Sequence, residues 1–229
     1  MQSLIPMALF GINPSKIRND FPSFNYTYLD SACMTLKPFS VIKKINDYYK
    51  EYPACAGRSS HKLAERVEQE VASARGAVRK LIHAQHDDEI VFTRNTTESI
   101  NLVAQGLNLE KGDAIIVTDK EHNSNLLPWM RLRDEKGINL IICPTNEDCA
   151  FNEQEFKRQF SNKVKLVSIA HISNLDGVTN PINEIIEYAH SKKALVLIDA
   201  AQSVAHIPLD VQKLDADFLA FSGHKMYGP

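Results

Sequence analysis

Two residues near the end of this 229-residue chain could do covalent chemistry together. Lys225 lies in the polar segment 222–229, which follows the apolar residues 217–221, and Asp199 ends the apolar run 194–198. An amine in such a loop can bond to an aldehyde, and a carboxylate can keep a pyridine nitrogen protonated. These are the groups that a pyridoxal phosphate (PLP) enzyme needs, so the pair predicts PLP chemistry.

Both residues also have ordinary explanations. Most lysines are solvated surface residues, and an aspartate after a strand can cap a helix. Lys225, however, stands between a predicted buried strand and Gly228, where loss of solvent favours the neutral, nucleophilic amine. Asp199 at the end of an apolar strand is costly without a cation. We therefore predict that both residues are functional.

Four further side chains are candidates for binding a phosphate group. Thr96 and Thr97 stand at the predicted start of a helix, where they can cap it or help its amides bind an anion. Ser222 and His224 can add contacts from the Lys225 loop. His122 supports two interpretations equally, a structural histidine or an imidazole that stacks on a cofactor ring and relays protons.

Other chemistries fit the sequence less well. Ser222 and Lys225 match the S-x-x-K motif of serine acyl enzymes, but the neighbouring glycines indicate a loop, and the chain has no S-D-N or K-T-G. His83 and His86 have a spacing that could bind metal, yet they stand at a polar helix end, so no metal site is predicted. The four cysteines form no C-x-x-C pair.

The composition is that of a soluble globular protein. Apolar residues make up 44% of the chain, and the net charge of −2 gives no argument for binding nucleic acid or an anionic membrane surface. No apolar run is long enough to cross a membrane, and the first ten residues lack the basic start of a signal peptide. We expect a cytoplasmic protein with free thiols.

Short apolar runs alternate with helical patterns along the chain, which predicts an α/β fold with a mostly parallel sheet and helices on both faces. The predicted strands are residues 89–93, 114–117, 139–142, 164–170, 194–198 and 217–221. The predicted helices are residues 37–49, 63–81, 96–105, 126–135, 151–160 and 181–190.

Polar clusters follow five of the predicted strands, at residues 94–98, 121–125, 171–174, 199–202 and 222–225. In parallel sheets, ligands bind beyond the carboxyl ends of the strands. The five clusters therefore predict an active site along that edge. We expect an N-terminal segment at residues 1–27 and a cofactor-binding domain at residues 28–229.

The chain resembles class V aminotransferase-fold enzymes, and among them most closely the Suf-type cysteine desulfurases and the selenocysteine lyases. The resemblance extends over nearly the whole chain from about Tyr28, in the order and spacing of that family. It rests on residues 28–32, 89–93, 96–104, 121–125, 128–129, 164–167, 173–174, 199–202, 210–212 and 217–229.

The resemblance implies the PLP-dependent transferase fold of type I and assigns a role to each candidate. Lys225 would hold the cofactor aldehyde and move protons, His122 would stack on the ring, and Asp199 would pair with the pyridine nitrogen. Gln202 and Asn174 would lie near the phenolic oxygen of the ring. The phosphate would be held by Thr97 with the Thr96 amide, Ser222 and His224.

The implied reaction converts L-cysteine to L-alanine, with the sulfur passed to an enzyme thiol as a persulfide. Members of the family are homodimers with the site at the subunit interface, and a sulfur-acceptor protein would receive the sulfur for iron–sulfur cluster assembly. Another class V enzyme (a selenocysteine lyase, an aminotransferase or an epimerase) and a catalytically silent fragment remain as alternatives.

The sequence departs from the family pattern in three places. Arg58 lacks the histidine that often precedes it, and Asn95 stands where a glycine is common. The family's second half is missing from residues 1–229; by the resemblance, that half supplies the small domain, the sulfur-accepting cysteine and the arginine that binds the substrate carboxylate. We therefore expect residues 1–229 alone to release no sulfide from L-cysteine.

Overall fold

The structure, a computed structural model, describes residues 13–229. They form two compact units, residues 13–69 with 224–229 and residues 70–223. The interpretation of the first ten residues lies outside the described part, and the segment predicted at residues 1–27 is described only from residue 13. The predicted border between residues 27 and 28 stays a prediction.

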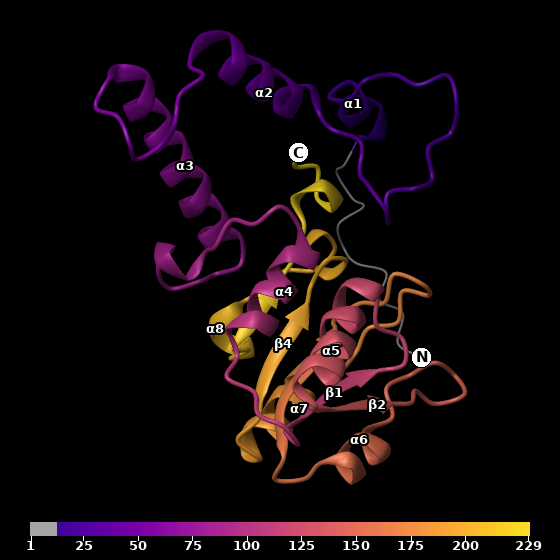
Figure 1. The fold of residues 1–229 in the computed structure, drawn as a ribbon. Helices are drawn as coiled ribbons and strands as arrows, with labels where there is room; N and C mark the ends of the chain where they lie inside the picture. Colours follow the sequence, from indigo (N-terminus) through magenta and orange to yellow (C-terminus); the bar gives the residue numbers. More distant parts are fainter. Residues whose placement is uncertain (1–12) are drawn as a thin grey trace. The chain divides into compact units, whose positions relative to one another are not determined.

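The second unit is built on one parallel sheet. Its strands follow the order β2-β1-β3-β4-β5, and each neighbouring pair is parallel (Figure 1). The strands are β1 (Ala114–Thr118), β2 (Asn139–Cys143), β3 (Val164–Ala170), β4 (Leu195–Asp199) and β5 (Phe218–Ala220). The prediction of an α/β fold with a parallel sheet is confirmed.

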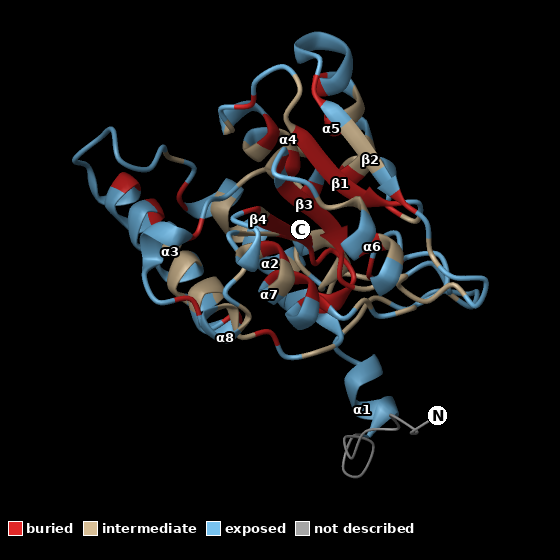
Figure 2. Cartoon of the chain, turned by 90° about the horizontal axis from the view of Figure 1, so that it is seen from below, coloured by how far each residue is buried: buried red, intermediate tan, exposed pale blue. Residues whose placement is uncertain are grey.

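Helices lie on both faces of this sheet. They are α4 (Thr96–Gly106), α5 (Asn123–Lys136), α6 (Glu153–Gln159), α7 (Ile182–Ser191) and α8 (Val211–Leu214). Ile100 of α4 and Trp129 of α5 pack with Ile115 and Leu197 on one face. The adjacent strand residues point the other way, toward the face where α7 packs on β4. Buried residues accordingly run along β1, β3 and β4 (Figure 2).

One predicted strand is wrong. Residues 87–89 form a 3₁₀ turn, and residues 90–93 pair with no strand of the described chain. The carbonyl of Ile90 accepts a hydrogen bond from the Arg75 guanidinium, and Val91 and Phe92 are 64% and 49% exposed. An apolar run becomes a strand only where a neighbouring strand edge can bond its N–H and C=O groups, and periodicity alone cannot report such a neighbour.

The first unit contains α1 (Pro14–Arg18), α2 (Phe39–Glu51) and the first part of α3 (Lys62–Leu81), and the 3₁₀ turn Gly223–Lys225 enters it. The predicted helices at 37–49 and 63–81 are thus found. The buried ring of Tyr52 lies 3.7 Å from the Arg66 guanidinium. Among the described helices, none has the length and apolar character to cross a membrane.

Candidate active site

The carboxyl ends of β3, β4 and β5 lie side by side. Ala170, Asp199 and Ala220 are register partners across the three strands, and Ser222 follows two residues after Ala220. The loop with His122 follows β1, which pairs with β3 on its other side. The sheet therefore gathers three of the predicted site residues, His122, Asp199 and Ser222, at one edge.

The start of α4 is bonded to the end of the sheet. The Thr96 N–H donates to Ser222 Oγ at 2.8 Å, the two hydroxyl oxygens are 2.6 Å apart, and both residues are buried. Asn95 caps the helix, its side chain accepting from the Glu98 N–H at 3.0 Å. A helix start with N–H groups and hydroxyls facing one place suits an anion such as a phosphate.

A chain of polar atoms links the starts of α4 and α5. Thr97 Oγ1 lies 2.7 Å from Ser124 Oγ, which lies 2.9 Å from His122 Nδ1. The Ser124 N–H also donates to His122 Nδ1 at 3.1 Å, so this imidazole caps α5. Because Nδ1 accepts, the ring proton of the neutral imidazole is on Nε2. The ring remains exposed, so capping leaves its face accessible.

Asp199 is a buried carboxylate at the end of β4. Its Oδ1 accepts from the Ala201 N–H at 2.9 Å, and its backbone oxygen accepts from the His171 N–H at 2.9 Å. Gln202 is buried three residues further along the chain. A carboxylate removed from water favours a nearby cation strongly, which is the property that a pyridine nitrogen needs from its partner.

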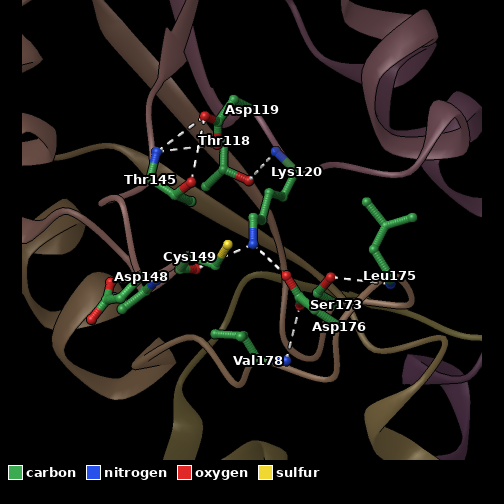
Figure 3. Close-up of polar contacts among 11 residues, drawn as sticks. Thr118, Asp119, Lys120, Thr145, Asp148, Cys149, Ser173, Leu175, Asp176 and Val178 are labelled. Carbon is green, nitrogen blue, oxygen red and sulfur yellow. Dashed lines mark hydrogen bonds and ion pairs between the residues drawn. The ribbon is translucent and has the colours of Figure 1, made fainter.

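Asn174 lies in a tight turn, residues 173–178, that is anchored by an ion pair. Lys120 Nζ binds the Asp176 carboxylate and also donates to the Cys149 carbonyl at 3.4 Å (Figure 3). The hydrogen bond from Lys120 lowers the pKa of Asp176 to about 2. The ion pair thus ties the turn that carries Asn174 to the loop that carries His122.

Glu121, which the sequence patterns did not single out, lies at the centre of a buried network. Its carboxylate accepts from Thr118 Oγ1 and Asn125 Nδ2, each at 2.6 Å, and from the Ala170 N–H at 2.9 Å. Burial raises its pKa to about 7; the three hydrogen bonds oppose that rise, and the charge of Asp199 adds to it. The signal in the sequence was an acid placed between an apolar strand and His122.

His171 was also not identified from the sequence as a candidate site residue. It is buried after β3, and its Nδ1 has no hydrogen-bond partner among residues 13–229. Burial lowers its pKa to about 4, so the ring is neutral near pH 7. It therefore adds a neutral ring, and no charge, beside the backbone of Asp199.

The last two predicted site residues, His224 and Lys225, belong to the first unit, directly after Gly223 in the chain. Burial lowers the pKa of His224, and the charges of Lys225 and Lys37 lower it further. The His224 backbone oxygen accepts hydrogen bonds from Thr35 and Lys37. The loop that carries Lys225 is thus held by residues near the start of the described chain.

The parallel sheet and the polar residues at the carboxyl ends of its strands agree with one family of enzymes. The sequence profile of the family Aminotransferase class-V matches residues 27–229, and the chain belongs to this family. This match agrees with the resemblance found in the sequence.

Within this family, the chain is similar to proteins named as probable cysteine desulfurases. The chain is 40% identical over 228 residues to a probable cysteine desulfurase of Halalkalibacterium halodurans, covering 95% of this chain and 56% of that protein. It is 43% identical over 223 residues to a probable cysteine desulfurase of Synechocystis sp., covering 93% and 53%. The chain thus spans about half the length of the curated relatives it matches.

Solved structures of cysteine desulfurases also resemble this chain. The cysteine desulfurase CsdA of Escherichia coli superposes with a TM-score of 0.87 at 37% identity, over 95% of this chain and 56% of that one. An apo cysteine desulfurase of Thermococcus onnurineus gives 0.89 at 38% identity, over 94% and 55%. A variant of the protein C-DES with glycine linked to its PLP cofactor gives 0.83 at 25% identity, over 91% and 56%.

Proposed function

We propose that this chain binds PLP and acts in cysteine desulfuration. In that reaction the C–S bond of L-cysteine is broken, L-alanine is formed, and the sulfur leaves on a thiol as a persulfide. The observation that carries the proposal is the sheet edge where the buried Asp199 carboxylate and the bonded pair Thr96–Ser222 end neighbouring elements. Relatives named as cysteine desulfurases and a related structure, SspA in complex with cysteine, support the substrate.

The donor set fits PLP. At the start of α4, the hydroxyls of Thr96, Thr97 and Ser222 offer neutral hydrogen-bonding groups for the phosphate. Asp199 offers the buried anion for the pyridine nitrogen. When bound, PLP supplies an electron sink for the pair of electrons left at the substrate Cα.

Each side chain then has a defined task. Asp199 keeps its charge against the ring nitrogen, and its bond from the Ala201 N–H fixes the direction of the carboxylate. The Ser124 bond restrains the His122 ring, whose face would stack on the cofactor ring and whose Nε2–H could donate. Lys225 holds the cofactor aldehyde and afterwards carries protons to and from the substrate Cα, with His224 at the phosphate.

Asn174 and Gln202 complete the ring contacts in this proposal. Both would donate to the phenolic oxygen, with Asn174 held in place by the anchored turn at residues 173–178. The protein would work as a homodimer in the cytoplasm and hand its sulfur to an acceptor protein for iron–sulfur cluster assembly.

A second candidate is a C–S lyase. The cystine C-S lyase C-DES, in complex with its product cysteine persulfide, superposes with a TM-score of 0.81 at 25% identity. A lyase of this kind eliminates the sulfur group and releases pyruvate and ammonia, whereas a desulfurase releases alanine. The organic product therefore separates the two reactions.

The test has two stages. The protein is loaded with PLP, reduced with borohydride and digested, and we expect the cofactor on the peptide that contains Lys225; cofactor on another lysine, with Lys225 unmodified, would overturn the assignment. The protein expressed from its complete reading frame is then given L-cysteine. Alanine in step with sulfide supports the desulfurase, and pyruvate supports the lyase.

A further inference from the structure

A single backbone carbonyl in the Lys225 loop receives three hydrogen bonds from residues almost 190 positions earlier. The His224 oxygen accepts from the Thr35 N–H at 3.0 Å, from Thr35 Oγ1 at 3.0 Å and from Lys37 Nζ at 2.8 Å. This oxygen belongs to the peptide bond that leads into Lys225. All these residues lie in the first unit, so the contact is internal to it.

Thr35 also holds the loop on the other side of Lys225. Its Oγ1 accepts from the Tyr227 N–H at 2.8 Å while donating to His224, so one buried hydroxyl uses both of its capacities on this loop. Tyr227 has a φ of 68°, the left-handed region that costs energy for a tyrosine, and its ring lies 5.7 Å from that of Phe21. The contacts of Tyr227 with Thr35 and Phe21 therefore hold its backbone in this left-handed conformation.

We propose that Thr35 and Lys37 are positioning residues that fix the backbone on both sides of Lys225, so that its amine is presented to the cofactor aldehyde. This proposal rests on the proposed function. In the step concerned, the amine nitrogen attacks the aldehyde carbon, a carbon–nitrogen double bond forms, and the aldehyde oxygen leaves as water. A restrained backbone speeds that step because less conformational freedom is lost on the way to the reactive geometry.

Lys37 contributes more than shape. Its ammonium makes a charge-assisted bond to the His224 oxygen, and burial lowers the pKa of Lys37, as expected for a cation partly removed from water. The bond therefore anchors the His224 carbonyl, one residue before Lys225.

The experiment compares two pairs of variants, each prepared free of PLP and then mixed with PLP or with pyridoxamine phosphate. Thr35→Val removes the hydroxyl at nearly constant shape and Thr35→Ser keeps it; Lys37→Met removes the ammonium and Lys37→Arg keeps a cation. The control is Lys43→Met, in the same unit, whose exposed side chain pairs with Asp47. The readouts are the rate at which PLP becomes fixable by borohydride on the Lys225 peptide and the affinity for pyridoxamine phosphate, which lacks the aldehyde.

We expect Thr35→Val and Lys37→Met each to slow the capture of PLP by Lys225 roughly tenfold, the factor that corresponds to about 1.4 kcal/mol. Capture in Thr35→Ser, Lys37→Arg and Lys43→Met should stay near the original rate, and pyridoxamine phosphate affinity should be unchanged throughout. If Thr35→Val does not fold, Lys37→Met carries the test.

Three results would contradict either the positioning role of Thr35 and Lys37 or the proposed function. Capture at the original rate in both Thr35→Val and Lys37→Met, with PLP fixed on Lys225, would remove the positioning role and leave the proposed function standing. Equal losses of capture and of pyridoxamine phosphate affinity would show a merely structural role. An unaltered protein that never fixes PLP on Lys225 would instead contradict the proposed function itself.

Discussion

Ser222 Oγ accepts the Thr96 backbone N–H at 2.8 Å, which joins the end of β5 to the start of α4 across 126 residues of sequence. Both residues are buried, and the two hydroxyls also bond each other. The geometry of the proposed phosphate site at α4 therefore depends on one side chain from the far end of the same unit.

Ser222→Ala tests this dependence. The change leaves the buried Thr96 N–H without its acceptor, so we expect the free energy of unfolding to fall by about 1–3 kcal/mol and PLP affinity to fall with it. Chemical denaturation and a PLP titration measure the two effects. Ser161→Ala, at an exposed turn, serves as the control. Unchanged PLP affinity in Ser222→Ala would argue against the phosphate site.

Glu121 should make stability depend on pH. Its pKa in the folded protein, about 7, is raised above its ordinary value of 4.5, so its contribution is fully present below pH 4.5 and is lost as the pH rises through 7. Glu121→Gln keeps the bonds to Thr118 and Ala170 without the charge. We expect this variant to gain stability relative to the parent between pH 5 and 8 by on the order of 2 kcal/mol.

The measurement is the free energy of unfolding at several pH values for both proteins. His171 acts in the opposite direction, because its lowered pKa of about 4 gives stability that is lost as the pH falls from 6.5 toward 4. His171 is the same in both proteins, so its contribution cancels when their free energies of unfolding are subtracted. The remaining difference includes the effect of the Asp199 charge on the pKa of Glu121. A difference that does not vary with pH would mean that Glu121 does not titrate in this range.

The thiols should differ in reactivity. Cys33 and Cys55 are exposed, whereas Cys143 is buried and burial raises its pKa to about 11. The thiolate is the reactive form, so iodoacetamide at pH 8 should modify Cys33 and Cys55 and spare Cys143 until the protein is unfolded. Mass spectrometry of native and denatured samples reads this out. Native modification of Cys143 at the rate of Cys55 would contradict its burial.

Asp199→Asn tests the proposed role of the Asp199 charge, which is to pair with the pyridine nitrogen of PLP. The amide oxygen can keep the bond from the Ala201 N–H, so the fold should persist and PLP should still bind. Chemistry at the substrate Cα should fall about 10²-fold or more, since a preorganised charge in a site removed from water is lost. Turnover of L-cysteine by the protein from the complete reading frame is the measurement. Near-normal turnover would refute the role of Asp199.

Periodicity and chemistry in the sequence were enough to predict most of the elements. Residues 114–117 and 195–198 are apolar throughout because both faces of a parallel strand are covered, and that pattern is local. Asp199 and Ser222 were predicted to be functional for a related reason, because polar side chains directly after apolar strands come to the ligand edge.

The tertiary structure decided what depends on partners distant in the chain. Residues 90–93 look like a strand in sequence, but they lack a neighbouring strand edge in the described chain. Burial in the fold raises the pKa of Glu121, and its bonding partners Thr118, Asn125 and Ala170 come from β1, α5 and β3. Thr35 reaches His224 across 189 positions. A sequence pattern reports which side chains prefer burial, whereas the partner of a hydrogen-bonding group is chosen by the fold.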